Sequence, residues 1–68
     1  MEFSKAYLYF FIEQKKMSVE EFRNKIGLSM TTWYKRMNEP DTFSYEEIKT
    51  IKNALDLTLE ELELIFFN

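Results

Sequence analysis

Apolar side chains recur along the chain at intervals of three and four residues, the spacing that places them on one face of an α-helix. Val19, Phe22 and Ile26 form one such stripe, and others begin at Trp33 and Ile48. A single Gly and a single Pro in 68 residues leave little room for strands and turns. The pattern predicts an all-α fold, with one domain over residues 1–68. We expect five helices, near residues 4–15, 19–26, 30–37, 45–55 and 59–66.

Three predicted helix starts carry a capping box, in which Ser or Thr and a Glu three residues later each bond the other's free backbone donor. The three pairs are Ser18 and Glu21, Ser44 and Glu47, and Thr58 and Glu61. Gly27 is predicted to end the helix that Ser18 starts, because a residue without Cβ adopts the left-handed conformation freely. The segment Asn38–Phe43 contains Pro40 and is predicted to be a loop.

The two short helices on either side of Gly27 have the pattern of a helix-turn-helix. Ser29 is predicted to cap the second helix, and Trp33 and Met37 are predicted to anchor it in the core. The inward position of Trp33 argues against stacking on single-stranded nucleic acid. The second helix of such a motif can lie in a DNA major groove.

Charge is distributed unevenly along the chain, whose net charge is −3. Residues 1–38 carry seven Lys and Arg against four Glu, which gives +3, and residues 39–68 carry two Lys against eight acidic residues, which gives −6. The half with the motif is therefore basic. This asymmetry is compatible with a one-sided electrostatic footprint, although charge runs usually serve solvation.

Several classes of function are excluded by composition. The chain has no Cys and no His, so disulfides, zinc fingers and imidazole chemistry are unavailable. The acidic clusters at residues 46–47 and 60–63 supply capping residues, and neighbouring carboxylates on a helix point in different directions. We therefore expect no enzymatic activity, no metal and no cofactor. The longest apolar run, Tyr7–Ile12, is too short to span a bilayer, and we expect a cytoplasmic protein.

A family resemblance extends from about Phe11 to Leu62. It is carried by the Ser18 helix start, the segment Ile26–Ser29, the segment Thr32–Tyr34, and Ala54–Leu62 after Ile48 and Ile51. With these features the chain resembles the lambda-repressor-like helix-turn-helix family, which contains phage Cro proteins and repressors. Thr32–Pro40 followed by Phe43 is most similar to small regulators from phages of Gram-positive bacteria. The resemblance implies a compact five-helix domain and a sequence-specific transcriptional regulator that binds double-stranded DNA.

The resemblance also implies which residues contact DNA. Lys35 is expected to bond guanine, Thr31 to contact a thymine methyl or bond a base edge, and Tyr34 to reach a phosphate or base. The full expected set is Ser29, Met30, Thr31, Thr32, Tyr34, Lys35, Arg36 and Asn38. Further candidates for phosphate contact are Lys5, Lys15, Lys16, Arg23, Lys25, Thr42 and Ser44. The alternative interpretation of all these residues is an ordinary solvated surface.

The chain departs from the family pattern at three places, one of which is the absence of the common Glu-x-Gly after the second helix of the motif. Val19 stands where many members carry a Gln that bonds a backbone phosphate. Arg23 stands where a small Ala usually allows close packing of the two helices. The stem of Arg23 can instead pack while its head pairs with a polar group.

Other functions and assemblies stay open at this stage. A reading helix in so small a domain touches few bases, so we expect a homodimer, formed on its own or only on DNA. The rival hypothesis is an antirepressor-like module that binds another regulator protein, which the acidic total charge and the apolar ends of the chain favour. A third is that the residues belong to a larger regulator, against which the start at Met1 weighs.

Both ends of the chain carry more apolar residues than one stripe needs. For Tyr7–Ile12 we favour burial in the core over an exposed interaction face. Leu59 and Leu62 are expected to close the core. Residues 65–67, Ile-Phe-Phe, are expected either to fold back onto the first helix or to bury against a second copy, and we predict self-association through this last helix.

Overall fold

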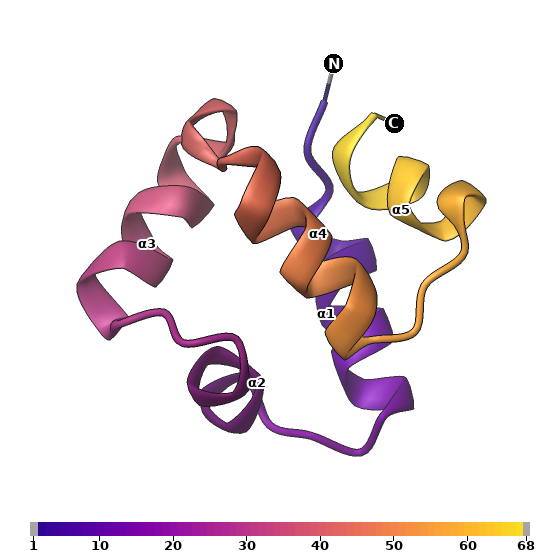
Figure 1. The fold of residues 1–68 in the computed structure, drawn as a ribbon, viewed down its shortest axis with the longest axis horizontal. Coiled ribbons are helices and arrows are strands. Elements are labelled where there is room, and N and C mark those ends of the chain that lie inside the picture. Colours follow the sequence, from indigo (N-terminus) through magenta and orange to yellow (C-terminus); the bar gives the residue numbers. More distant parts are fainter. Residues whose placement is uncertain (1, 68) are drawn as a thin grey trace.

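The computed structural model describes residues 2–67, which form five α-helices and no strand (Figure 1). The helices are α1 (Lys5–Gln14), α2 (Val19–Lys25), α3 (Met30–Asn38), α4 (Tyr45–Ala54) and α5 (Leu59–Phe66). Each boundary lies within one residue of its predicted position, so the all-α prediction is confirmed. The predicted loop after α3 differs in detail. Asn38 still belongs to α3, and a 3-10 turn, η1 (Pro40–Thr42), occupies the loop.

Three of the connections between helices have the same construction. The residue after the last helical turn is left-handed in each: Lys16 has φ 58°, Gly27 has φ 77° and Asp56 has φ 51°. An apolar residue and then a Ser or Thr N-cap follow: Met17 and Ser18, Leu28 and Ser29, Leu57 and Thr58. In each turn the amide of the apolar residue bonds the carbonyl five residues back, as in a Schellman motif.

The helix starts follow the sequence prediction. Ser18, Ser44 and Thr58 each form the complete capping box with the Glu three residues later. Two backbone N–H groups at the start of each of α2, α4 and α5 are therefore satisfied by side chains three residues away. The chain then turns sharply at the left-handed residues, which lets short amphipathic helices pack around one centre.

Every helix contributes at least one buried side chain to the core. These residues are Leu8 and Ile12 of α1, Phe22 of α2, Trp33 of α3, Ile51 of α4, and Ile65 and Phe66 of α5, joined by Phe43, Leu55 and Leu57 from the connections. Trp33 is an inward anchor, as predicted. Its ring meets the ring of Phe22 edge-on at 6.1 Å between centroids, which fixes α3 against α2.

The C-terminal helix closes the core instead of leaving its apolar end in water. The rings of Phe3, Phe43 and Phe66 form a cluster with centroid separations of 5.2–5.7 Å. The backbone N–H of Ser4 also donates to the carbonyl of Ile65 at 2.7 Å. Of the two outcomes expected for residues 65–67, Ile65 and Phe66 show folding back, because both side chains are buried within this chain, whereas Phe67 is exposed. Self-association through the last helix stays a prediction.

Two predictions of burial were wrong. Tyr7 and Phe10 of α1 are exposed, because the core face of that helix follows Leu8 and Ile12 and these two residues lie on its outer side. Leu59 does not close the core and is 67% exposed. It occupies the first turn of α5, where it lines a surface groove beside α4.

None of the helices formed by residues 2–67 has the length and apolar character required to cross a lipid bilayer.

Candidate nucleic-acid interface

The helix-turn-helix is formed by α2, the turn at Gly27 and α3, and it lies at one side of the fold (Figure 1). Burial of Phe22 and Trp33 turns one face of each helix inward. Because helical residues three and four apart share a face, Trp33 and the half-buried Met37 define the inner side of α3, and the opposite side of the helix points outward. The packing of the motif thus selects which side chains of α3 are available to a partner.

Four predicted contact residues lie together on the outward face of α3. Met30 is 56% exposed and Tyr34 is 60% exposed, and Thr31 and Lys35 are exposed as well. No hydrogen bond or ion pair within residues 2–67 uses the side chains of Thr31, Tyr34 or Lys35. Their donors and acceptors are therefore free for an external partner.

Ser29 and Thr32 are committed to the start of α3. The Ser29 Oγ accepts from the backbone N–H of Thr32 at 3.2 Å and donates to the Thr32 Oγ1 at 3.0 Å. Thr32 is half-buried, so the structure places it beside the cap and not on the outward face. Ser29 remains exposed at the helix N-terminus.

Arg36 faces α4. Its Nε and Nη2 donate to the two carboxylate oxygens of Glu47 at 2.8 and 3.1 Å, and its Nη1 donates to the Thr42 Oγ1 at 3.2 Å. This placement differs from the expected phosphate contact, because every guanidinium nitrogen already has a partner. Sequence reasoning identified Glu47 as a capping residue and missed it as the partner of Arg36, a contact for which the sequence carries no local signal.

The pair also shifts the ionisation of both groups. The hydrogen bonds from Arg36 hold the pKa of Glu47 below its usual range, against a smaller opposing effect of burial. The same hydrogen bonds raise the pKa of Arg36. Both groups therefore stay charged at neutral pH, and the end of α3 is tied to the start of α4.

The remaining basic candidates are scattered over several elements. Asn38 is exposed at the end of α3, and Lys5 and Lys25 are exposed on α1 and α2. The Nζ of Lys15 forms an exposed ion pair with Asp56 at 3.1 Å. Lys16 occupies the left-handed turn after α1.

Arg23 spans the turn of the motif. Its Nη1 donates to the backbone carbonyl of Leu28 at 3.0 Å, and its side chain is half-buried. Arg23 thus joins α2 to the last residue before the cap of α3.

A groove of about 260 Å³ runs between α2 and the first two turns of α3. Its lining includes Val19, Arg23, Met30 and Tyr34, together with Tyr9 from α1. Tyr9 was not expected beside the outward face of α3, because a contact between residues so far apart in sequence leaves no periodic signal. The groove makes α1 a neighbour of the motif.

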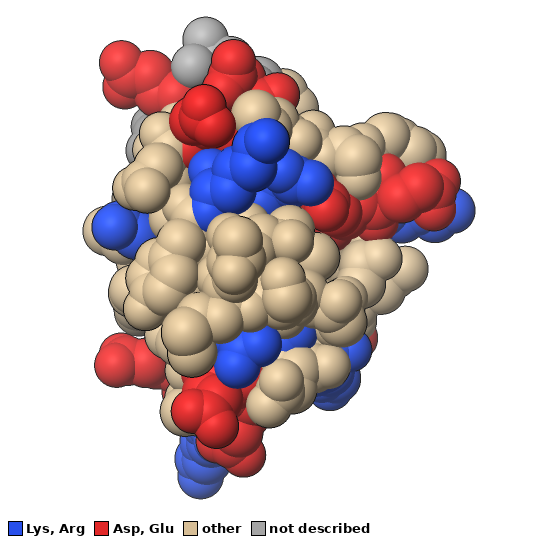
Figure 2. All heavy atoms as spheres, turned by 90° about the vertical axis from the view of Figure 1, so that its left-hand side faces the viewer, with Lys and Arg blue, Asp and Glu red and all other residues tan. Residues whose placement is uncertain are grey.

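Charge on this side of the molecule is arranged around an uncharged centre. In Figure 2, which faces the left-hand side of Figure 1, Lys and Arg atoms lie above and below a mainly uncharged area. Most of the acidic atoms lie nearer the margins. Basic groups that border an uncharged face suit a ligand with a polyanionic backbone and less charged edges.

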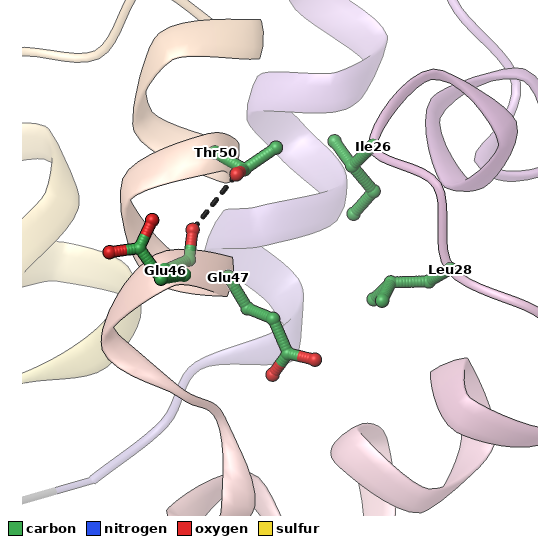
Figure 3. A pocket seen from close by; sticks show the side chains of 5 residues that line it. All are labelled: Ile26, Leu28, Glu46, Glu47 and Thr50. Atoms are coloured by element: carbon green, nitrogen blue, oxygen red, sulfur yellow. Dashed lines mark hydrogen bonds between the residues drawn. The ribbon is translucent and has the colours of Figure 1, made fainter.

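A small hollow lies where the motif meets α4. Figure 3 shows Ile26 and Leu28 from the end of α2 and the turn facing Glu47 and Thr50 of α4 across a space of about 100 Å³. The Thr50 hydroxyl donates to the carbonyl of Glu46 at 2.8 Å, so it is satisfied within α4. The hollow is a packing boundary, and no three acidic side chains within residues 2–67 are placed to hold a metal ion.

Comparison with known proteins agrees with this geometry. The model of one protein family, described as the Cro/C1-type HTH DNA-binding domain, matches residues 10–65. Searches of curated proteins and of solved structures gave no match. The matched segment runs from α1 to α5 and includes the whole helix-turn-helix. The chain therefore belongs to the Cro/C1-type helix-turn-helix DNA-binding domains, a non-enzymatic family.

Proposed function

We propose that residues 1–68 act as one sequence-specific DNA-binding domain, a transcriptional regulator of the Cro or repressor type that inserts α3 into the major groove of its operator. The observation that carries the proposal is the outward face of α3. Met30, Thr31, Tyr34 and Lys35 are exposed there, while Trp33 of the same helix is buried. An exposed helix face with unused hydroxyl and amino groups suits base-edge recognition.

Each residue of this face has a role in the proposal. Lys35 donates to guanine, Thr31 contacts a thymine methyl or bonds a base edge, and Tyr34 reaches a base or phosphate. Met30 packs against bases from the first turn of α3. Ser29 contacts a phosphate at the start of α3, where free backbone amides favour an anion, and the side-chain amide of Asn38 contacts a phosphate at the other end of the helix.

Thr32 and Arg36 have supporting roles in this proposal. Thr32 holds the cap of α3 through Ser29, and Arg36 positions the end of α3 through Glu47. A residue that holds α3 in place without touching DNA affects the affinity for DNA by changing the angle of α3. Its substitution is expected to weaken binding to all operators alike.

The protein binds its operator as a homodimer in this proposal. A helix of nine residues reads few base pairs, and two copies on half-sites about 34–36 Å apart double the contacts. Cro and repressor functions of this kind belong to phages and bacteria, so the proposal includes a cytoplasmic location.

A second candidate function is supported by α1. Tyr7 and Phe10 are exposed on its outer side, next to the exposed Ala6. An apolar face on a DNA-binding fold also suits an antirepressor-like module that binds another regulator. The regulator binds DNA, whereas the antirepressor-like module binds another regulator protein in place of DNA.

Selection of DNA from a random library by the purified protein, at one stated salt concentration, tests the proposal. We expect one enriched sequence, and we expect Tyr34→Ala to lose the enrichment while Tyr7→Ala on α1 retains it. Failure of the wild-type protein to enrich any sequence would refute the proposal. Tight capture of a regulator protein in that case would support the second candidate.

A further inference from the structure

We propose that Met30 and Tyr34 form an apolar surface that reads the C5-methyl group of a pyrimidine in the major groove. The inference rests on the proposed function and deepens it, because it names the chemical group on DNA that this part of α3 selects. Thymine and 5-methylcytosine both carry a methyl group at C5, so both are sources of the ligand.

Met30 and Tyr34 form an exposed apolar strip at the start of α3. They are four residues apart, so their side chains share one side of the helix, and both are exposed. Both line the groove of about 260 Å³ between α2 and α3, which is also lined by Val19, the first residue of α2. Apart from the Tyr34 hydroxyl, these three side chains carry no strong hydrogen-bonding group. The strip is therefore suited to an apolar ligand.

The edges of the base pairs present one kind of apolar group in the major groove. Guanine, adenine and cytosine display ring nitrogens, carbonyl groups and amino groups there, whereas thymine adds a methyl group at C5. A polar base edge covered by Met30 would lose its water without gaining a hydrogen bond, which is unfavourable. A methyl group gains from the same contact, because apolar area leaves water on both sides. The chemistry of the strip thus selects a pyrimidine that carries a methyl group.

The position of the strip within the motif directs it at the bases. The second helix of a helix-turn-helix contacts base edges through its N-terminal residues, while the first helix crosses the backbone. Met30 is the first residue of α3, and Tyr34 lies one turn further on. Figure 2 views the molecule from the side on which α3 lies in Figure 1, and the centre of that side is mainly uncharged. In the proposed complex the strip therefore meets base edges.

The charges of the groove do not suit a backbone phosphate. Among the described residues that line it, Glu20 and Arg23 are charged, and their charges have opposite signs. The carboxylate of Glu20 repels phosphate oxygens and offsets the charge of Arg23, whose Nη1 already donates to the carbonyl of Leu28. Val19 offers a phosphate no side-chain donor. The groove thus favours an uncharged occupant.

Deoxyuridine tests the methyl contact, because it differs from thymidine only in lacking the C5-methyl group. Each thymine of the selected operator is replaced singly, and binding of the whole protein is measured by fluorescence anisotropy at one salt concentration. We expect at least one replacement to weaken binding about three- to fivefold, the effect of burying one carbon group. Unchanged affinity at every thymine overturns the inference and leaves the regulator standing. A protein that enriches no DNA sequence refutes both, so the two failures are distinguishable.

Substitutions on α3 assign the methyl group to its contact surface. Met30→Gln keeps the length of the side chain and makes its end polar, so the ratio of the affinities for thymine and deoxyuridine is expected to fall toward one. Tyr34→Phe keeps the ring and is expected to keep that ratio. Thr31→Ser is the matched control, because it removes another exposed methyl group from the same helix. A ratio that is lost in Thr31→Ser and kept in Met30→Gln overturns the assignment. Circular dichroism checks that these exposed substitutions leave the helices intact.

5-Methylcytosine distinguishes the two sources of the methyl group. The sensitive T·A pair of the operator is changed to C·G, and the cytosine is then methylated at C5. A gain of about three- to fivefold on methylation shows that the strip accepts the methyl group from either base. Absence of that gain, together with the loss on deoxyuridine, assigns the strip to thymine alone.

Discussion

Arg36 in the last turn of α3 and Glu47 in the first turn of α4 form a two-pronged ion pair, with Nε–Oε1 at 2.8 Å and Nη2–Oε2 at 3.1 Å. The same Glu47 Oε1 accepts from the backbone N–H of Ser44 at 2.9 Å, as the N3 residue of a capping box. One carboxylate thus starts α4 and holds the end of the reading helix. Paired geometry of this kind is stronger than a single surface contact.

Glu47→Gln is expected to lower the free energy of unfolding by about 1–3 kcal/mol at neutral pH, because a charged acceptor is removed from a half-buried guanidinium. The pKa of Glu47 is lowered in the folded protein by the hydrogen bonds from Arg36. Its contribution is therefore complete above the ordinary carboxyl pKa of 4.5 and is lost as the pH falls through the lowered value. Urea unfolding from neutral to acidic pH should show the two proteins converging in stability. Glu46→Gln, on the exposed side of α4, is the control, and an unchanging difference would contradict the prediction.

Lys35→Ala is expected to weaken operator binding by about 1–3 kcal/mol and to relax the preference at one base position, because the proposed contact reads a base edge. Fluorescence anisotropy on the selected operator and on its single-base variants measures both effects. Lys49→Ala removes the same charge from the exposed side of α4, outside the proposed DNA contacts, and serves as the control. A uniform loss across all sequences, with a shallower salt dependence, would assign Lys35 to a phosphate.

Phe66→Ala is expected to cost about 3–5 kcal/mol, because the ring is 1% exposed and packs against Phe3 and Phe43. A domain of this size has a total stability of only about 3–10 kcal/mol, so Phe66→Leu is a necessary milder variant. Phe67→Ala removes a ring that is 55% exposed and is expected to change stability little. Thermal unfolding of the three variants compares them, and equal losses for Phe66 and Phe67 would contradict the packing of α5.

Gly27→Ala is expected to destabilise the protein by about 1–2 kcal/mol, the cost of a left-handed L-residue. The cause is the backbone alone, since a Cβ at this position meets nothing within 4 Å. Lys16 has the equivalent place after α1, with φ 58°. Lys16→Gly removes that cost but adds chain entropy, and it is expected to stabilise by roughly 0.5–1 kcal/mol. Denaturant midpoints of the two variants should move in opposite directions.

Arg23→Ala is expected to lower stability by about 1–3 kcal/mol, because the hydrogen bond across the motif turn to Leu28 is lost. Arg23→Lys separates this role from a charge effect, since it keeps the positive charge and removes the guanidinium. If Arg23 acts through the turn, both variants lose stability and DNA affinity together. Retention of both properties by Arg23→Lys would assign Arg23 to a phosphate contact.

Local features of the sequence were sufficient for the helices and for the motif. A capping box involves residues three apart, as Ser18 and Glu21 illustrate, so its hydrogen bonds form without any distant partner. The same holds for Gly27, whose conformation depends on its own lack of a side chain. Helical spacing identified Trp33 as the inward residue of α3, and it thereby indicated which residues face outward. The left-handed turns at Lys16 and Asp56 carry no glycine and gave no such signal.

The burial of the surplus apolar residues and the partner of Arg36 depended on how the helices pack. Phe66 and Phe67 are chemically identical neighbours, and only the position of α5 against Phe3 and Phe43 puts one ring in the core and leaves the other exposed. Arg36 is eleven residues from Glu47, and the turn through η1 brings them together. Hydrophobic periodicity indicates that one face of a helix is apolar, but it does not indicate which other segment of the chain covers that face. That information lies in distances between segments, which local propensities do not contain.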